Sequence, residues 1–334
     1  MKPRTATRRR FISQAAGAGF AWGAAPMAMA QSDWPKAPIK LVVPYAPGGM
    51  NDIVMRLVSR HVADRIGQPI VIDNRPGAGG IVGTNAVAKA TPDGYTIGAG
   101  ATSTLIATPL TNPQSTVDVI KDLAFVSLLA TAPMLLTVNA SLPARNAAEL
   151  LKHLQANRNK LNFGSMAVGH FGHVTILALS ESADAAMVHS AYKGEAPLLQ
   201  DLVGNHIQLA FVTPPVVKPM AEAGKVRLLA VSGTKRLKLF PDVATLIEQG
   251  FDSPIFRMNA GWMGIVAPAK TPPAIVQRLS EEYAAAIRHP DINEQLMNLG
   301  LDPIGSNAES FRATYLSEKV VWRDTLIKAG IEVK

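Results

Sequence analysis

Residues 44–52 combine glycine with a helix start, a pattern suited to binding an anion. The apolar residues 39–43 predict a buried strand, and the segment Pro47-Gly48-Gly49-Met50-Asn51-Asp52 follows its end. The spacing of apolar residues then predicts an amphipathic helix over 52–66. A helix N-terminus exposes backbone N–H groups and partial positive charge, and glycine lets a ligand approach them closely. The sequence therefore predicts a carboxylate or phosphate site that needs no Arg or Lys.

Asn51 and Asp52 admit two interpretations. Both residue types are favoured helix N-caps, because their side-chain oxygens accept hydrogen bonds from unpaired N–H groups of the first turn. Either side chain could instead contact the ligand directly, and a cap at this position would also shape the anion site. The sequence leaves both roles open.

A second strand-to-helix junction repeats this logic. Residues 161–165 predict a strand that ends at Ser165, Met166–Gly169 form a loop, and a helical stretch begins at His170. Ligands of open α/β sheets bind at the carboxyl ends of strands, so we expect the two junctions to face each other across a cleft. A neutral His170 is expected to donate a hydrogen bond to a ligand carboxylate.

Other chemistries fit these residues less well. Ser165 lacks a surrounding G-x-S-x-G turn, which argues against a hydrolase triad. His170 and His173 share a helix face, but the sequence supplies no further ligands for a metal. The run Gly77–Gly83 has Val82 where a G-x-G-x-x-G dinucleotide turn requires its third glycine. We therefore expect no catalytic residue, no metal and no cofactor.

Lys193 and Trp262 each have two possible roles. Lys193, beside Tyr192, is either a cation of the cleft or a solvated loop residue, because lysine is seldom buried. Trp262 either walls the cleft or belongs to the core, which is the commoner place for a Trp on a strand.

Residues 1–30 predict an export signal. The start is basic and free of acids, with Lys2, Arg4 and Arg8-Arg9-Arg10, and a short Ala/Gly-rich stretch leads to the small residues Ala28-Met29-Ala30. Thr7–Ile12 resembles a twin-arginine signal, which is an address and not an anchor. We expect cleavage near Ala30 and a periplasmic mature protein; the alternative is an uncleaved basic tail.

Composition excludes several classes of function. The chain has 33 basic and 25 acidic residues, a net charge of +8, but five of the basic residues lie in the export signal and the remainder carries +3. No basic stretch interleaved with aromatic residues remains, so a nucleic-acid surface is not expected. Cysteine is absent, which excludes disulfides, thiolate metal sites and cysteine nucleophiles.

Strand and helix patterns alternate along the chain, which is typical of an α/β fold with mostly parallel sheets. The predicted strands are 39–43, 69–73, 95–100, 124–130, 134–138, 161–165, 187–190, 207–212, 226–231 and 261–267. The predicted helices are 52–66, 81–89, 147–157, 171–181, 195–203, 215–223, 274–288, 291–299 and 308–329.

The pattern is interrupted at Pro133 and at Pro254–Arg257, which we interpret as crossovers between two lobes. Lobe I is predicted to comprise residues 31–131 plus 258–334, and lobe II residues 132–257. Two crossings would act as a hinge for closure around a ligand.

Five motifs in a fixed order resemble one protein family. Pro44–Asp52 is followed by Asp73-Asn74-Arg75-Pro76-Gly77-Ala78-Gly79-Gly80, Thr91-Pro92-Asp93-Gly94-Tyr95-Thr96, Tyr192-Lys193-Gly194-Glu195-Ala196-Pro197 and Ala267-Pro268-Ala269-Lys270-Thr271-Pro272. In this order and spacing they closely resemble the periplasmic substrate receptors of tripartite tricarboxylate transporters. The resemblance runs from Trp34 to the C-terminal helix that contains Trp322.

The resemblance implies a two-lobed class II periplasmic-binding-protein fold, with a hinge of two crossover segments and no enzymatic activity. It implies that a ligand carboxylate is held by the loop at 47–52 and the turn at 165–170, and that Thr102-Ser103 lines the same cleft. The expected ligand-binding residues are Pro47, Gly48, Gly49, Met50, Asn51, Asp52, Thr102, Ser103, Ser165, Ala167, Val168, Gly169, His170, Lys193 and Thr213.

Three positions depart from the family's pattern. Ala167 stands where Gly is common, His170 where a small hydroxyl residue is common, and Val212 where an Asp is common, followed here by Thr213. An acid at position 212 could pair with a ligand ammonium group. Its absence predicts a carboxylate ligand without an amino group, which could be bulky or aromatic.

We therefore expect a monomeric periplasmic receptor that captures a small organic acid and delivers it to a tripartite tricarboxylate-type permease in the inner membrane. Two alternatives stay open: an exported hydrolase that uses Ser165 and a histidine, and a ligand-sensing subunit of a membrane signalling protein. Transport and sensing look alike in sequence, because both present a closed pair of lobes to a membrane partner.

Overall fold

The computed structural model describes residues 34–192 and 194–333, and the chain from Pro35 onward forms one compact unit. The predicted export signal at 1–30 and the predicted site residue Lys193 lie outside the described residues. Within the described ranges, no helix has both the length and the apolarity that a bilayer crossing requires.

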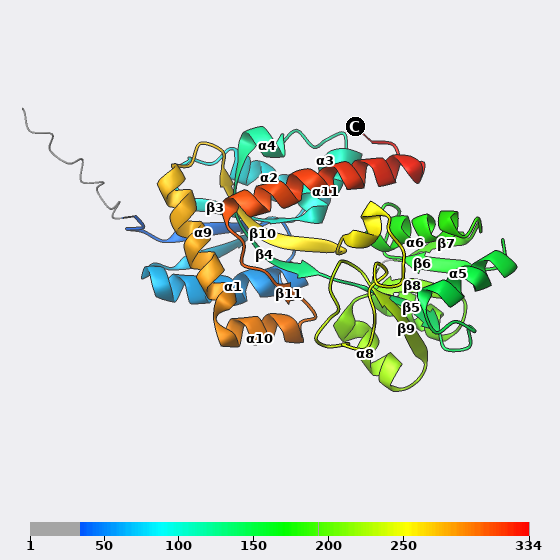
Figure 1. Cartoon of the computed structure of the whole chain (residues 1–334). Helices are drawn as coiled ribbons and strands as arrows, with labels where there is room; N and C mark the ends of the chain where they lie inside the picture. The colour runs from blue at the N-terminus through cyan, green and yellow to red at the C-terminus, as the bar shows by residue number, and fades with distance from the viewer. Residues whose placement is uncertain (1–33, 193, 334) are drawn as a thin grey trace, which may run out of the picture. The chain divides into compact units, whose positions relative to one another are not determined.

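Two sheets form the framework of this unit (Figure 1). The first sheet has six strands in the order β11-β4-β10-β3-β1-β2 and the second has five in the order β7-β6-β8-β5-β9. The first comprises β1 (Ile39–Val43), β2 (Ile70–Asn74), β3 (Thr96–Ala101), β4 (Leu123–Ala132), β10 (Gly261–Pro268) and β11 (Asp302–Pro303). The second comprises β5 (Leu135–Asn139), β6 (Asn162–Ser165), β7 (Val188–Ala191), β8 (Leu209–Val212) and β9 (Val226–Val231).

Helices pack against each sheet. Those of the first sheet are α1 (Met50–Ile66), α2 (Ile81–Ala88), α9 (Pro273–Arg288), α10 (Pro290–Asn298) and α11 (Ala308–Lys328). Those of the second are α5 (Ala147–Ala156), α6 (Phe171–Ser182), α7 (Glu195–Val203) and α8 (Pro214–Glu222). Short helical turns complete the fold: η1 (Ala78–Gly80), η2 (Ser103–Ala107), α3 (Thr108–Thr111), α4 (Val119–Asp122) and η3 (Pro254–Arg257).

The sequence patterns located every long element to within two residues at each end. They missed β11 and the short turns η1, η2, α3, α4 and η3. The strand β11 consists of Asp302 and Pro303 and exists because these residues pair with Thr131 and Ala130 of β4. Such a contact has no local sequence signature, because Asp-Pro by itself is typical of a turn.

The prediction of mostly parallel sheets was wrong, because both sheets are mixed. In the second sheet β5 runs antiparallel to its neighbours β8 and β9, while β6 is parallel to β7 and β8. In the first sheet β10 runs antiparallel to β3 and β4, and β11 to β4. The strands β5 and β10 are the first to follow each passage of the chain between the sheets. Each enters its new sheet from the opposite end, which reverses its direction.

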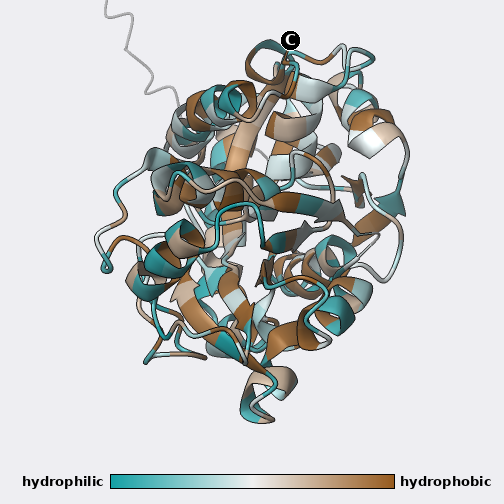
Figure 2. Cartoon of the chain, turned by 90° about the vertical axis from the view of Figure 1, so that its right-hand side faces the viewer, coloured by the Kyte–Doolittle hydropathy of each residue, from teal (hydrophilic) through white to brown (hydrophobic). Residues whose placement is uncertain are grey.

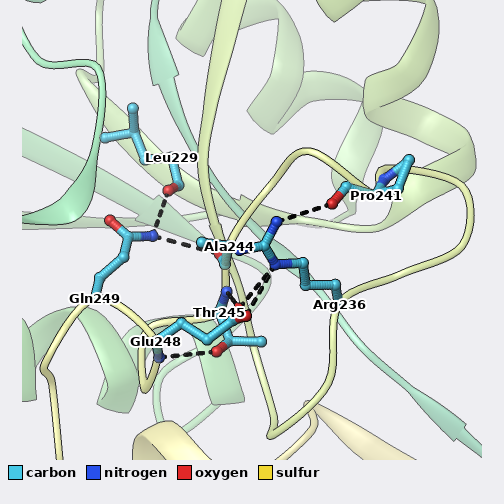
Figure 3. Close-up of polar contacts among 7 residues, drawn as sticks. All are labelled: Leu229, Arg236, Pro241, Ala244, Thr245, Glu248 and Gln249. Carbon is cyan, nitrogen blue, oxygen red and sulfur yellow. Dashed lines mark hydrogen bonds and ion pairs between the residues drawn. The ribbon is translucent and has the colours of Figure 1, made fainter.

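The second of these passages, between β9 and β10, is fastened to the edge of the second sheet (Figure 3). Thr245 and Glu248 exchange hydrogen bonds of 2.7 and 3.0 Å through their backbone N–H groups, the arrangement of a capping box. Arg236 Nε lies 3.0 Å from both carboxylate oxygens of Glu248. Gln249 Nε2 donates to the carbonyl of Leu229 in β9 at 2.9 Å. These bonds replace regular secondary structure in this segment.

The core lies between the strands and their helices, as the brown strands of Figure 2 indicate. Trp262 of β10 is 2% exposed and packs edge-on against Phe311 of α11, so it belongs to the core and not to the wall of a cleft. The helix α11 (red in Figure 1) contacts β4 and extends to η3 near the second sheet. One side chain near its end, Leu326, together with Ile331, lies 3.5 Å from where a Cβ on Gly169 would be.

Candidate functional site

The parallel strands of the first sheet bring several predicted site residues to one edge. The strands β2, β1 and β3 are adjacent and parallel, so their carboxyl ends lie together. The segment 44–49 follows β1, Arg75 follows β2, and Thr102-Ser103 follows β3. We call this the first edge, and the segment 44–50 the first turn.

The first turn begins α1 two residues earlier than predicted. Gly48 has φ +79°, which favours glycine, and Gly49 is the N-cap of a helix that starts at Met50. The interpretation of Asn51 and Asp52 as N-caps was therefore wrong, because both lie inside the first helical turn. Pro47, Gly48, Gly49 and Met50 are exposed at the surface of this turn.

Asp52 is the centre of the hydrogen bonds at the first edge. Its carboxylate accepts from the N–H of Gly48 at 2.9 Å, Arg56 Nε at 2.9 Å and Asn74 Nδ2 at 2.8 Å. The hydrogen bond from Arg56 outweighs burial and lowers the pKa of Asp52 to about 2. Asp52 is 2% exposed, so its negative charge stabilises the turn from within. The N–H of Gly48, one of the donors that the sequence predicts for a ligand, is therefore already hydrogen-bonded to Asp52.

Hydroxyl groups link the first turn to the end of β3. Tyr45 Oη and Ser103 Oγ lie 2.8 Å apart. Thr102 is 3% exposed, and its Oγ1 accepts from the backbone N–H of Trp262 at 3.0 Å. Ser103 is exposed, whereas the Thr102 hydroxyl joins β3 to β10.

The second edge is built in the same way. The strands β7, β6 and β8 are adjacent and parallel, and their carboxyl ends carry residues 192 and 194–195, the segment 165–170 and Thr213. We call the segment 165–170 the second turn. Gly169 has φ +78°, and His170 is the N-cap of α6, with Nδ1 accepting from the N–H of Gly172 at 3.2 Å. Ala167 and Val168 are exposed, and His170 is half-buried.

Neutral histidines support the second turn. His173 Nδ1 accepts from the N–H of Gly169 at 3.0 Å, and the rings of His173 and His189 lie 4.0 Å apart. Burial, and to a smaller extent the neighbouring histidine, lowers the pKa of both His170 and His173 to about 4. Because Nδ1 of neutral His170 is an acceptor here, its proton is on Nε2. This nitrogen is therefore a donor, and its hydrogen bond to a ligand carboxylate stays a prediction.

The contacts of Ser165 do not activate it as a nucleophile. Ser165 Oγ lies 2.9 Å from the carbonyl oxygen of Ala167 and 2.8 Å from His189 Nε2. A carbonyl can only accept, so the hydroxyl proton points to Ala167 and His189 must donate to Ser165. His189 is then a donor and not a general base. Ser165 is also 2% exposed, which places it behind the surface of the turn.

Thr213 is held by an acid that the sequence did not single out. Its N–H donates to Glu195 Oε1 at 2.8 Å, and its hydroxyl donates to Oε2 at 2.6 Å. Burial raises the pKa of Glu195, and the two hydrogen bonds from Thr213 oppose this effect. The predicted site residues of each sheet are therefore gathered at one edge, with Lys193 outside the described residues.

Two further observations concern metal sites and a large cavity outside the two turns. In the described part of the chain, no group of three or more His, Cys, Asp or Glu side chains is arranged to hold a metal ion. A cavity of about 1330 Å³ lies between α6, η3 and α11, and its lining contains no residue of either turn. Its lining includes α6 residues such as Val174 and Leu177 and α11 residues such as Val321.

Sequence patterns missed the side chains that complete each turn. Arg56, Asn74, His189 and Glu195 were not among the predicted site residues, although each reaches one of them. Asn74 ends β2, so the order of parallel strands would have placed it beside the first turn. His189 and Glu195 could be found only from the position of β7 next to β6.

A family comparison agrees with this arrangement. The sequence profile of the tripartite tricarboxylate transporter family receptor matches residues 54–330. The chain belongs to this family. It is a family of periplasmic solute-binding receptors and not of enzymes. The resemblance noted from the motifs is thus confirmed.

Individual relatives match along most of their length. A relative from Pseudomonas sp., described by its place in the tcbD-tcbE intergenic region, is 34% identical over 88% of this chain and 87% of its own. BugT of Bordetella pertussis is 30% identical over 90% of this chain and 92% of its own. The similarity therefore extends over both lobes of the receptor and is not confined to one.

Solved structures confirm the two-lobed fold. A solute-binding receptor from Polaromonas has a TM-score of 0.78 at 26% identity, covering 88% of this chain and 99% of that one. A Rhodopseudomonas palustris protein solved with adipate has a TM-score of 0.73 at 31% identity, covering 90% and 99%. MatC from the same species, solved with bound malate, has a TM-score of 0.68 at 29% identity, covering 88% and 100%. The class II periplasmic-binding-protein fold predicted from the sequence is thereby confirmed.

Proposed function

We propose that this protein is a periplasmic receptor that captures a small organic carboxylate between the first and second turns and delivers it, as a monomer, to a tripartite tricarboxylate-type permease in the inner membrane. The observation that carries the proposal is the matched pair of turns. Each has a glycine with φ near +80° two residues before a helix, at +79° for Gly48 and +78° for Gly169. A helix start leaves backbone N–H groups without an intrahelical partner, and such groups can bind an anion.

The chemistry of the turns suits a carboxylate. Helix dipoles favour negative charge at both starts, and hydrogen bonds to an ionised group are the stronger ones. His170 adds a donor at Nε2 in its neutral form. Two relatives of similar fold were solved with the carboxylates adipate and malate, which supports the same class of ligand here.

Closure of the two lobes would bring the second turn onto a ligand already held by the first. Lobe I comprises residues 31–131 plus 258–334, and lobe II comprises residues 132–257. Thr102, Ser103, Val168, His170 and Thr213 would then select the ligand by shape. Export would use the twin-arginine-type segment at 1–30, with cleavage near Ala30.

The ligand can be tested without knowing its identity. Mass spectrometry of small molecules that co-purify with the protein is expected to find an organic acid, whose affinity calorimetry then measures. Gly49→Pro removes one N–H from the first turn, whereas Gly49→Ala retains it and suits the local φ of −77°. We expect loss of binding in the first variant and near-normal binding in the second, with thermal melts confirming that both are folded. Equal binding by both variants would contradict the proposal.

The partner and the absence of catalysis need separate measurements. A strain without the permease is expected to lose uptake of the identified acid; unimpaired uptake would favour the sensing alternative. Ester and amide substrates should show no turnover, because Ser165 donates its proton to a carbonyl and His189 is a donor. Measurable hydrolysis abolished by Ser165→Ala would favour the hydrolase alternative.

A further inference from the structure

The position of Glu195 follows from the order of the strands. In β7-β6-β8, the strand β6 lies between the other two. Glu195 lies beyond the end of β7, and Thr213 directly follows β8. The hydrogen bonds between them therefore cross the carboxyl end of β6, where the second turn begins. The Glu195 carboxylate lies at the second edge, beside the helix start that is proposed to hold the ligand.

The contacts of Glu195 fix its orientation. Each oxygen accepts one hydrogen bond from Thr213, at 2.8 and 2.6 Å, so the carboxylate is held by two donors of one residue. Among the described residues, no ion pair of Glu195 is found. The side chain is half-buried, which reduces the solvent screening of its charge. Each carboxylate oxygen keeps a further lone pair that can accept from a ligand donor.

This acid changes the expectation drawn from Val212. The sequence suggested that the second edge lacks an acid, because Val212 stands where an Asp is common in the family. Glu195, at the start of α7 beyond the end of β7, supplies a carboxylate to the same edge from the other side of β6. A negative charge at this position repels a second carboxylate of the ligand and favours a hydrogen-bond donor.

We propose that Glu195 is a specificity-determining residue that makes this receptor prefer monocarboxylates, with a neutral or donor group at the far end, over dicarboxylates. The inference rests on the proposed function, because it concerns the ligand of the same site.

The test compares acids that differ only at one end. Calorimetry at pH 7.5 would measure adipate, its monoamide and hexanoate, and the corresponding sets with four and eight carbons. The monoamide and the monoacid are expected to bind the wild type at least about tenfold more tightly than the diacid, the size of effect expected for like charges held in proximity.

The variant Glu195→Gln keeps an acceptor for Thr213 and removes the charge. It is expected to reduce the preference to within about threefold, by gaining affinity for the diacid. Glu222→Gln is the matched control, because it removes an acid of the second lobe from the exposed end of α8. This control should retain the wild-type preference, and thermal melts should show that both variants are folded.

The outcomes separate this inference from the proposed function. Diacids that bind the wild type as tightly as their monoamides, or a preference unchanged in Glu195→Gln, would overturn the role of Glu195 alone. If neither monoacids nor diacids of any length bind, the proposed function fails and this inference fails with it.

Discussion

In both turns, a glycine two residues before a helix donates its N–H to a side chain four residues later. The acceptor is the carboxylate of Asp52 in the first turn and the imidazole Nδ1 of His173 in the second. The backbone of the turn therefore requires an acceptor but not a charge. Asp52 brings a negative charge that Arg56 offsets, whereas neutral His173 adds no charge beside the positive end of α6. We expect the first turn, with its charge-assisted hydrogen bonds, to be the more tightly held.

The largest effect on stability is expected from removing Asp52, the acid of the first turn. Asp52→Ala leaves the Gly48 N–H, Asn74 and Arg56 without their acceptor. We expect a loss of about 3 kcal/mol in the free energy of unfolding, because buried groups lose charge-assisted hydrogen bonds. Urea denaturation measures it, and Asp73→Ala, which breaks the half-exposed pair with Arg75, is the control. Equal losses in the two variants would contradict the central role of Asp52.

Asp52 and His173 should contribute to stability in different pH ranges. Histidine has a pKa of 6.5 when unfolded, and His173 has a pKa of about 4 in the folded protein. Between these values the unfolded chain binds more protons, so stability is lost as pH falls from 6.5 towards 4, by about 3 kcal/mol for this residue.

The contribution of Asp52 is expected at lower pH. It is complete above the unfolded pKa of 3.8 and is lost as pH falls through about 2. Unfolding measured between pH 8 and 2, with values chosen to span both windows, should show two phases. His173→Asn should reduce only the upper one, to which His170 also contributes. A single phase that this variant does not alter would contradict the prediction that His173 and Asp52 contribute in different pH ranges.

Replacing His173, the acceptor in the second turn, tests how its charge affects ligand affinity. His173→Asp gives the second turn an acid like that of the first, without an arginine to offset it, and His173→Asn gives a neutral acceptor. We expect the Asp variant to bind the organic acid about tenfold more weakly than the Asn variant, because the added charge opposes the helix dipole. Calorimetry checks the ratio. Equal affinities would mean that the charge of this acceptor is irrelevant to binding.

The smallest effect is expected at the N-caps. Gly49 caps α1 without a side chain, whereas His170 caps α6 through Nδ1. His170→Ala should cost about 1 kcal/mol in stability, and His170→Asn, a good cap, should restore most of it. If Nε2 of His170 also contacts the ligand, the Asn variant will be stable but bind less tightly. Thermal melts and calorimetry on the same samples distinguish the two roles.

The folding pattern and the two turns were largely predictable from the sequence, for local reasons. Glycines with φ near +80° and the helix starts that follow them leave a signature within a few neighbouring residues, as at Gly48 and Gly169. The order of motifs likewise identified the family from short segments. The direction of β5 and β10 was not predictable, because it depends on how the chain re-enters a sheet after crossing between the two.

What the sequence determined by itself is where two amide-rich helix starts occur and which class of receptor contains them. Only the tertiary structure decided which side chains complete them. Glu195 and Thr213 are 18 residues apart, and Ser165 and His189 are 24 residues apart. Such pairs meet because β7 pairs with β6 after the intervening helix α6, and because β8 then pairs with the other side of β6. A backbone turn is specified locally, but the charges around it are contributed by whichever strands lie alongside.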